Sequence, residues 1–246
     1  MSSSDIISVG AVDNPDARVV RIVHISDTHL QHKKYIENKN IPDGDILVHS
    51  GDFAKFDFSR LYSREEDYLS EVNELNNFFA SLPHRYKIFV SGNHETNFLR
   101  EPTERTSCLL TNGIYLQDSW VTIEGIKFYG SPWNGIRHNS FARGFGVLYS
   151  SLPNYWKLIP DDTDILITHN PPFSILDLGS NKHFLNVAVY CELCKEDHKE
   201  FLHFGCPVLR DEVLHRIRLV QFIHSFIHLL RESIEFLLKR PTQRHN

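Results

Sequence analysis

Four short apolar runs in the sequence are each followed by side chains that can bind a metal ion. The four sets are Asp27-Thr28-His29, Gly51-Asp52, Gly92-Asn93-His94-Glu95 and His169-Asn170-Pro171-Pro172. In open α/β sheets, ligands bind at the carboxyl ends of the strands, so sets that follow successive strands converge on one edge. The repetition predicts a single site assembled from four strand ends.

The elements that must position these side chains are buried strands and a connecting helix. The apolar runs are short and rich in β-branched residues: Val19–Ile25, Asp45–His49, Tyr86–Val90 and Asp164–Thr168. Such runs, bounded by small or polar residues, are typical of buried strands. Between the second and third runs, apolar residues from Leu69 to Leu82 recur at near-helical spacing and Pro83 follows. This pattern predicts a helix and hence a βαβ unit.

The middle of the chain predicts a second sheet and a loop. Trp120–Phe128 alternates apolar and polar residues around Glu124-Gly125, which is the pattern of a hairpin with one buried face. We interpret this hairpin as the start of a second sheet. Ser131–Trp156 is rich in aromatic residues, glycine and asparagine without a sustained period, which predicts a long loop or lid beside a site.

The ligand types indicate which ions the site would take. Asp27 and His29 are two residues apart, so on a strand their side chains lie on the same side and can bind one ion. A mixture of Asp, Asn and His suits borderline divalent ions better than calcium or copper. We expect manganese first, with iron or zinc as alternatives.

Two ions sharing one carboxylate would make the site reactive toward phosphate. Asp52 is the natural shared ligand, because a carboxylate bridges two ions where the neutral amide of Asn93 cannot. Two divalent charges exceed the negative charges of Asp27, Asp52 and a bridging hydroxide, so the site stays positive. Two ions roughly 3.5–4 Å apart activate a shared water and stabilise an in-line displacement. His94 is not needed as a ligand and is placed to protonate the leaving alcohol.

Each set alone also has a simpler structural interpretation. Asp27-Thr28-His29 could be a strand-to-loop turn with a capping aspartate, and Glu95 is expected to support the ligands rather than to bind metal. The four sets in order, each after a strand, favour a metal site, present or ancestral.

Composition bounds the remaining possibilities. The chain has 246 residues, of which 41% are hydrophobic and 23% charged, and this is the balance of one large α/β domain. The net charge is -5 and no run of Lys or Arg is present, so we expect no nucleic-acid groove. Leu219–Leu238 is apolar but contains Arg231, Glu232 and Glu235, so we expect no membrane span.

The cysteines and the start of the chain point to a reducing compartment. Met1–Gly10 lacks the basic start and apolar core of a secretory signal, so we expect a cytoplasmic protein with reduced thiols. Cys191 and Cys194 form a C-x-x-C pair, but Cys206 with Cys108 does not make the second pair that a structural zinc site would want. Free thiols are therefore favoured over zinc ligands here.

The ligand sets D-x-H, G-D, G-N-H-E and a histidine followed by two prolines resemble the calcineurin-like metallophosphoesterase superfamily. Wider stretches, such as Leu116-Gln117-Asp118-Ser119 and Tyr129-Gly130-Ser131-Pro132-Trp133, are similar to its small subgroup of metallophosphoesterase-domain proteins, akin to class III cyclic-nucleotide phosphodiesterases. The resemblance runs from about Val19 to Leu214. It implies a four-layer αββα sandwich with a dinuclear site between the two sheets.

The resemblance also implies roles for single residues. It assigns Asp27, His29 and Asp52 to one metal, and Asp52, Asn93 and His169 to the other. It makes His94 the acid. The family pattern continues to a last strand ending in Gly-His-x-His, which this sequence lacks.

The end of the chain departs from the family in its predicted structure. Ile217–Leu238 has apolar residues three or four apart, so we expect a truncated sandwich finished by an amphipathic helix. His224 and His228 would share a face of that helix. They are either a replacement ligand pair or, as we expect, ordinary histidines that supply no ligand. The chain would then comprise a loose leader (1–18), the metallophosphoesterase domain (19–214) and a helical tail (215–246).

Two functions follow from these expectations. The first is a phosphoesterase that hydrolyses small phosphodiesters, with cyclic nucleotides as plausible substrates. The alternative is a catalytically impaired variant that acts as a metal-binding, nucleotide-binding or protein-interaction module.

Overall fold

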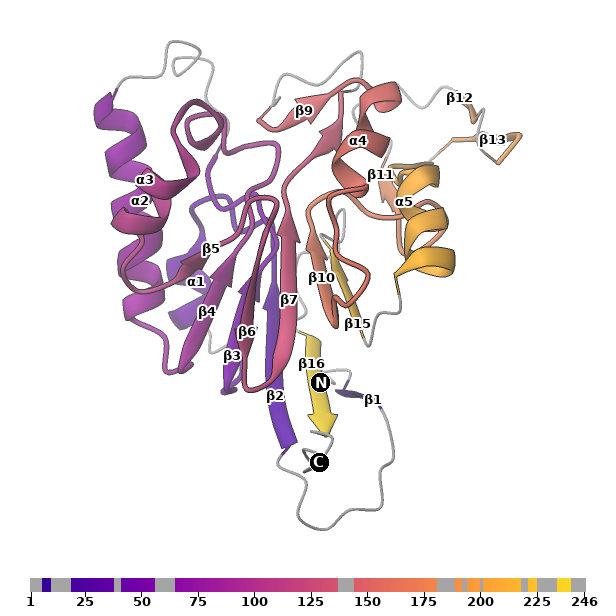
Figure 1. Ribbon diagram of the computed structural model, residues 1–246. Helices are drawn as coiled ribbons and strands as arrows, with labels where there is room; N and C mark the ends of the chain where they lie inside the picture. The colour runs from indigo at the N-terminus through magenta and orange to yellow at the C-terminus, as the bar shows by residue number, and fades with distance from the viewer. Residues whose placement is uncertain are drawn as a thin grey trace.

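Two β-sheets lie face to face, and helices cover the outer face of each (Figure 1). The computed structural model describes residues 6–9, 19–37, 41–55, 65–136, 144–180, 189–191, 194–199, 201–217, 221–224 and 234–239. No helix among these residues is long and apolar enough to cross a lipid bilayer.

The larger sheet has six strands. Their spatial order is β1 (Ile6–Val9), β16 (Ile234–Lys239), β2 (Val19–Ile25), β3 (Ile46–His49), β4 (Tyr86–Phe89) and β5 (Ile114–Tyr115). Strands β2 to β5 are parallel, and β16 runs antiparallel to β2. The helical segments near this sheet are α1 (His32–Glu37), α2 (Glu65–Ala80), the 3-10 turn η2 (Phe98–Arg100) and α3 (Thr103–Leu109).

The smaller sheet has four strands, in the order β15 (Gln221–His224), β10 (Ile165–Thr168), β7 (Ile126–Ser131) and β6 (Ser119–Ile123). Strands β15, β10 and β7 are parallel, and β6 forms an antiparallel hairpin with β7. Its helices are α4 (Leu152–Trp156), which follows the 3-10 turn η3 (Tyr149–Ser151), and α5 (Pro207–Asp211), which continues into the π-helical turn η4 (Glu212–Arg216). Three two-stranded ladders complete the fold: β8 (Asn134–Gly135) with β9 (Gly146–Val147), β11 (Leu178–Ser180) with β14 (Phe201–His203), and β12 (Val189–Cys191) with β13 (Glu196–His198).

Strand alternation divides the buried residues into three cores. On β3, Ile46 and Val48 point toward the smaller sheet and pack with Phe128 and Ile167. Leu47 points the other way, into the core beneath α2. A third core lies between the smaller sheet and its helices, around Trp156. Because side chains on a strand alternate in direction, one run of apolar residues supplies two cores.

The predicted four-layer α/β fold and its main elements are confirmed. The four expected strands are β2, β3, β4 and β10, each within one residue of the expected bounds, and the expected helix is α2. The hairpin is β6–β7, and its turn residues Glu124 and Gly125 have φ values of 52° and 78°. Glycine adopts this left-handed region without steric cost, which explains its place in the turn.

The predicted C-terminal helix is wrong in the part of the tail that the structure describes. Gln221–His224 is strand β15 beside β10, and Ile234–Lys239 is strand β16 beside β2. Ile223 joins the core between the sheets. The edges of β10 and β2 offer unpaired backbone groups, and pairing with them overrides a local helical period.

Two other segments also differ from expectation. Ser131–Trp156 is not a uniform loop, because it contains β8, β9, η3 and α4, while residues 137–143 lie outside the described part. Within the expected leader, Ile6–Val9 is strand β1, paired with β16. The segments at both ends of the sequence thus join the larger sheet.

Candidate metal centre

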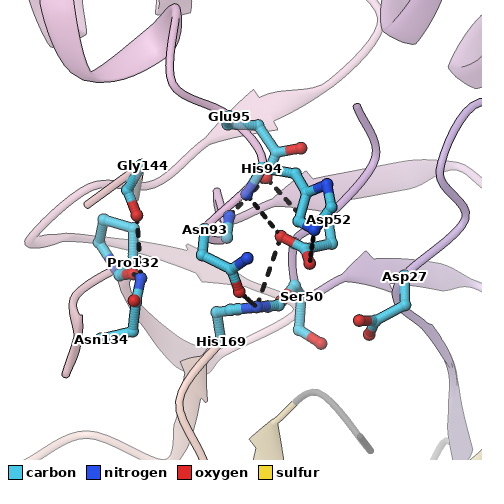
Figure 2. Close-up of polar contacts among 12 residues, drawn as sticks. Asp27, Ser50, Asp52, Asn93, His94, Glu95, Pro132, Asn134, Gly144 and His169 are labelled. Atoms are coloured by element: carbon cyan, nitrogen blue, oxygen red, sulfur yellow. Dashed lines mark hydrogen bonds and ion pairs between the residues drawn. The ribbon is translucent and has the colours of Figure 1, made fainter. Parts of the chain in front are cut away.

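The predicted ligands meet at the carboxyl ends of strands from both sheets. Asp27 follows β2, Asp52 follows β3, Asn93 and His94 follow β4, and His169 follows β10. Figure 2 shows these five side chains around a common space. The convergence predicted from the sequence is present.

The loops after β2 and β3 run side by side and hold their ligands with backbone hydrogen bonds. The N–H of Asp27 donates to the carbonyl of Gly51 at 2.9 Å, and the N–H of His29 donates to the carbonyl of Asp52 at 3.1 Å. Asp27, His29 and Asp52 have φ values of 53°, 44° and 55°. Left-handed backbone at non-glycine residues is held only where surrounding contacts enforce it, and it concentrates at functional sites.

Two glycines allow the loops to approach closely enough. A Cβ on Gly51, whose φ is 106°, would lie 2.7 Å from both the Gly92 nitrogen and His169 Nδ1. A Cβ on Gly92 would lie 2.3 Å from Asp52 Oδ1. The Gly-Asp and Gly-Asn sequences are therefore required by space as well as by turn geometry.

Asp52 lies at the centre of the cluster. Its Oδ1 is 3.4 Å from His169 Nε2, and its Oδ2 is 3.5 Å from His94 Nε2. The His94 backbone N–H also donates to Oδ1 at 2.9 Å. The side chain is almost fully buried. Each oxygen thus faces a different histidine, as a carboxylate shared by two ions must.

The outer ring nitrogens of two histidines are fixed by backbone carbonyls. His169 Nδ1 lies 3.0 Å from the Ser50 carbonyl, and His29 Nδ1 lies 3.1 Å from the Ala54 carbonyl. A carbonyl only accepts, so Nδ1 carries the proton and, in a neutral ring, Nε2 carries the lone pair. Such carbonyl contacts orient histidine ligands in metal sites.

The inner nitrogen of His169 then faces other acceptors. His169 Nε2 lies 2.9 Å from Asn93 Oδ1 and 3.4 Å from Asp52 Oδ1. Three lone pairs directed at one another are satisfied by a cation. The residues present therefore fit a divalent metal ion.

Charges in the cluster reinforce one another. Burial alone would raise the pKa of Asp52, but the neighbouring His169, His94 and His29 hold it below its ordinary value. Burial alone would lower the pKa of His169, but the carboxylates of Asp52 and Asp27 outweigh it and raise the pKa. The cluster therefore attracts positive charge. The pKa of His94 is lowered by burial, only partly opposed by Asp52.

Glu95 fastens the loops to each other and is fully buried. Its Oε2 accepts from the N–H groups of Asp52 at 2.9 Å and Gly92 at 2.5 Å, and its Oε1 accepts from Ala54 at 2.8 Å. Burial and the nearby Asp52 raise the pKa of Glu95 to about 8. The supporting role expected for Glu95 agrees with these contacts.

Two groups of side chains have ligand atoms within 4.8 Å of one another, and Asp52 belongs to both. One group adds His29 and His94, and the other adds Asp27 and His169. This grouping differs from the pairing that the family resemblance implies, in which Asp27 and His29 share an ion. His94 lies within ligand distance as well as within reach of a substrate. The pairing and the role of His94 stay predictions.

The sequence did not predict the backbone carbonyls that contact the histidines, nor the strand β15 beside β10. The carbonyls of Ser50 and Ala54 have no side-chain signal that could have revealed them. Strand β15 was hidden by the helical spacing of its apolar residues. It places His224 opposite Thr168, one residue before His169. His228 lies outside the described residues.

The fold and the site together define a metal-binding α/β sandwich of phosphoesterase type. The calcineurin-like phosphoesterase family model matches residues 20–204. The chain belongs to this family.

Curated relatives agree with this assignment, and a solved structure shares the fold. A UPF0046 protein from Caenorhabditis elegans is 35% identical over 69% of this chain and 58% of its own length. Metallophosphoesterase domain-containing protein 1 from Homo sapiens is 37% identical over 64% of this chain and 50% of its own length. The chain thus spans between half and three-fifths of these relatives. A solved crystal structure with 14% identity shares the fold over 90% of each chain, with a TM-score of 0.54.

Proposed function

We propose that the protein is a metal-dependent phosphoesterase that hydrolyses small phosphodiesters. The observation that carries this proposal is the buried carboxylate of Asp52, which belongs to two overlapping groups of ligand atoms. Asp27, His29, Asp52, Asn93 and His169 would hold two divalent ions, manganese first and iron or zinc as alternatives. Bound ions would supply an activated water and positive charge for an in-line displacement at phosphorus.

The protein side chains have distinct tasks in this reaction. Asp52 would be the ligand that both ions share, and the backbone N–H of His94 fixes one of its oxygens. His94 lies at the rim of the cluster, with its ring 4.5 Å from that of His29, and is partly exposed. We propose that it donates a proton to the leaving alcohol. Burial lowers the pKa of His94, and the negative charge of a bound phosphodiester would favour its protonated form.

The end of β15 gives the site a further strand end. Because β15 is parallel to β10 and pairs His224 with Thr168, it ends at the edge where His169 lies. The expectation that the tail supplies no ligand rested on a helix that the described residues do not form. We propose that this strand end, which carries His224, adjoins the metal centre.

The substrate and the compartment are also proposals. A site that recognises phosphate accepts a small phosphodiester or nucleotide, including a cyclic nucleotide. No disulfide joins any of the four cysteines, all of which lie in the described part of the chain, and this supports a reducing compartment such as the cytoplasm.

An assay with bis-p-nitrophenyl phosphate tests the activity. The full chain, loaded with manganese, should hydrolyse this diester, and a chelator followed by dialysis should abolish turnover until metal returns. Asp52→Asn serves as the control for a contaminating hydrolase, because it should be inactive at equal metal concentration. Undiminished turnover in chelator would reject a metal-dependent reaction.

The absence of Gly-His-x-His from the sequence supports a second candidate, a domain that binds metal or nucleotide without turnover. The same preparation decides between them. Metal bound at full occupancy without hydrolysis of the model diester or a cyclic nucleotide would favour the binding function.

A further inference from the structure

A second metal-binding cluster lies outside the centre described above. We propose that Cys191, Cys194, His198 and His203 bind a structural zinc ion. Cys191, Cys194 and His198 each offer an atom within 4.8 Å of the others. The observation that carries the proposal is this juxtaposition of two thiols and an imidazole on one short hairpin.

The hairpin β12–β13 brings the three side chains together. Its register places Val189 opposite His198 and Cys191 opposite Glu196. The N–H of Lys195 donates to the carbonyl of Cys191 at 2.7 Å, and Lys195 has a φ of 63°. This tight turn returns the chain so that Cys194 faces the second strand. Cys194 Sγ lies 2.9 Å from His198 Nε2.

These separations suit tetrahedral zinc. With Zn–S bonds of about 2.3 Å and Zn–N bonds of about 2.0–2.1 Å, ligand atoms lie roughly 3.3–3.8 Å apart. The contact between Cys194 Sγ and His198 Nε2 is shorter than this range, and the three ligand atoms all lie within 4.8 Å of one another, so small side-chain shifts would admit the ion. Thiolate and imidazole ligands favour zinc over manganese. The cluster therefore differs in metal preference from the Asp, Asn and His centre.

His203 supplies the fourth ligand in our proposal. Its ring centroid lies 5.2 Å from that of His198. His203 Nδ1 lies 2.9 and 3.0 Å from the two carboxylate oxygens of Asp177, so Nδ1 is the protonated nitrogen and Nε2 the coordinating one. Asp177 is buried and is also held by the Gly205 N–H at 3.1 Å. A carboxylate behind a histidine is a common support for zinc ligands.

The ion would connect two small ladders. His203 belongs to β14, which pairs with β11, whereas the other three ligands lie on β12–β13. Each of these strands has three residues, and isolated two-stranded ladders of this size are marginal in water. The β12–β13 hairpin lies at the periphery, away from the main sheets (Figure 1). Four protein ligands leave no open position, which indicates a structural rather than a catalytic ion.

The spacing C-x2-C-x3-H-x4-H explains why the sequence alone favoured free thiols. The sequence contains no second C-x-x-C pair, because the other two proposed ligands are histidines. His198 and His203 became candidates only through the hairpin and the Asp177 contact.

Cobalt substitution of the full chain tests the site. Thiolate ligands give Co²⁺ an intense near-ultraviolet charge-transfer absorption, and the Asp, Asn and His centre contains no sulfur. We expect one equivalent of Co²⁺ to produce this absorption and zinc to displace it. Cys191→Ser and Cys194→Ser should abolish it, whereas Cys108→Ser, on the exposed side of α3, should retain it. Asp52→Asn should retain it too, because that variant changes only the other centre.

The zinc content and thiol reactivity provide the second measurement. Bound zinc should protect two thiols per chain from a disulfide reagent, and protection should be lost in both hairpin variants but kept in Cys108→Ser. His203→Gln and Asp177→Asn should weaken zinc binding on the order of 10- to 100-fold. Circular dichroism confirms that each variant is folded. A folded wild-type chain with no thiolate absorption, or with equal absorption in Cys191→Ser, would overturn the zinc site, and unchanged affinity in His203→Gln would overturn the fourth ligand.

Discussion

The carboxylate of Glu95 accepts a hydrogen bond from the backbone N–H of Asp52 at 2.9 Å. Glu95, which supports the centre, is thus hydrogen-bonded directly to Asp52, which belongs to both groups of ligand atoms. Because Glu95 also accepts from Gly92 and Ala54, it fixes the loops after β3 and β4 relative to each other. The position of Asp52 therefore depends on a side chain that lies outside both groups of ligand atoms.

Glu95→Gln should lower both stability and metal affinity. Both oxygens of Glu95 accept hydrogen bonds from backbone N–H groups. In either orientation of the glutamine amide, its NH₂ group would therefore face at least one of these N–H donors. A buried N–H donor left without an acceptor costs about 1–3 kcal/mol. Urea unfolding measures the free energy of unfolding, and isothermal titration measures manganese affinity. Glu104→Gln, at an exposed position of α3, is the matched control and should change neither quantity.

Asp52→Asn and His94→Ala should separate metal binding from chemistry. The neutral amide of Asn cannot bridge two ions, so Asp52→Asn should lose metal. His94→Ala should keep its metal and lose on the order of 10²–10⁴-fold in rate, the usual contribution of a positioned general acid. Metal per chain is measured by elemental analysis and rate by diester hydrolysis. Equal metal loss in the two variants would show that His94 is a ligand, as its distance to Asp52 permits.

Gly92→Ala should disturb the metal centre without creating a cavity in a hydrophobic core. The added methyl would lie 2.3 Å from Asp52 Oδ1 and 2.7 Å from His169 Cε1, so the Asp52 carboxylate must move. We expect at least a tenfold loss of manganese affinity by titration. Gly113→Ala is the contrasting variant, because its methyl would meet the Phe79 ring at 2.5 Å. Overpacking there costs about 1–3 kcal/mol of stability but should leave metal affinity intact.

His224→Gln should weaken binding of at least one ion if β15 delivers a ligand. The strand register places His224 beside Thr168 at the site edge, and a catalytic ion usually has three or more protein ligands. Competition with a metal indicator measures both affinities. His215→Gln, at an exposed position, controls for removal of a histidine. Identical affinities in wild type and His224→Gln would return the tail to a purely structural role.

Stability should fall in mild acid because of His84, which precedes β4 and so lies at the opposite end of that strand from the centre. Burial lowers its pKa, partly opposed by the hydrogen bond from Nε2 to the Pro42 carbonyl. Its Nδ1 is buried and has no hydrogen-bond partner among the residues that the structure describes. A folded-state pKa below the ordinary value of 6.5 means that the unfolded chain binds the proton more readily. The contribution is thus present above pH 6.5 and lost as pH falls through the folded pKa.

Denaturant unfolding across this pH range checks the His84 prediction. His84→Gln, which can still donate to Pro42, should flatten the decline in stability between pH 7 and pH 5. His215→Gln should keep the wild-type profile. A His84→Gln profile that matches wild type would assign the decline to other groups.

The sequence was most informative where local pattern and tertiary structure agree. Val19–Ile25 is apolar, β-branched and followed by Asp27, so both the strand and the place of Asp27 in the cluster were predictable. The central place of Asp52, which belongs to both groups of ligand atoms, agrees with the shared role predicted for it from charge. Ile223 was assigned to a helix because its neighbours repeat at three or four residues, yet it packs between the sheets. The strand conformation of this segment is explained by its pairing with the edge of β10. The spacing of apolar residues along the chain does not show where a sheet has an unpaired edge.

The insertion of β16 between β1 and β2 has a consequence for biosynthesis. As the chain leaves the ribosome, β2 pairs with β3 on one side but keeps its other edge bare until residues 234–239 emerge. An exposed strand edge is a template for pairing with another chain. The nascent protein therefore depends on β16 to cover the free edge of β2. A chain that is terminated early, after β10, should require chaperones to stay in solution.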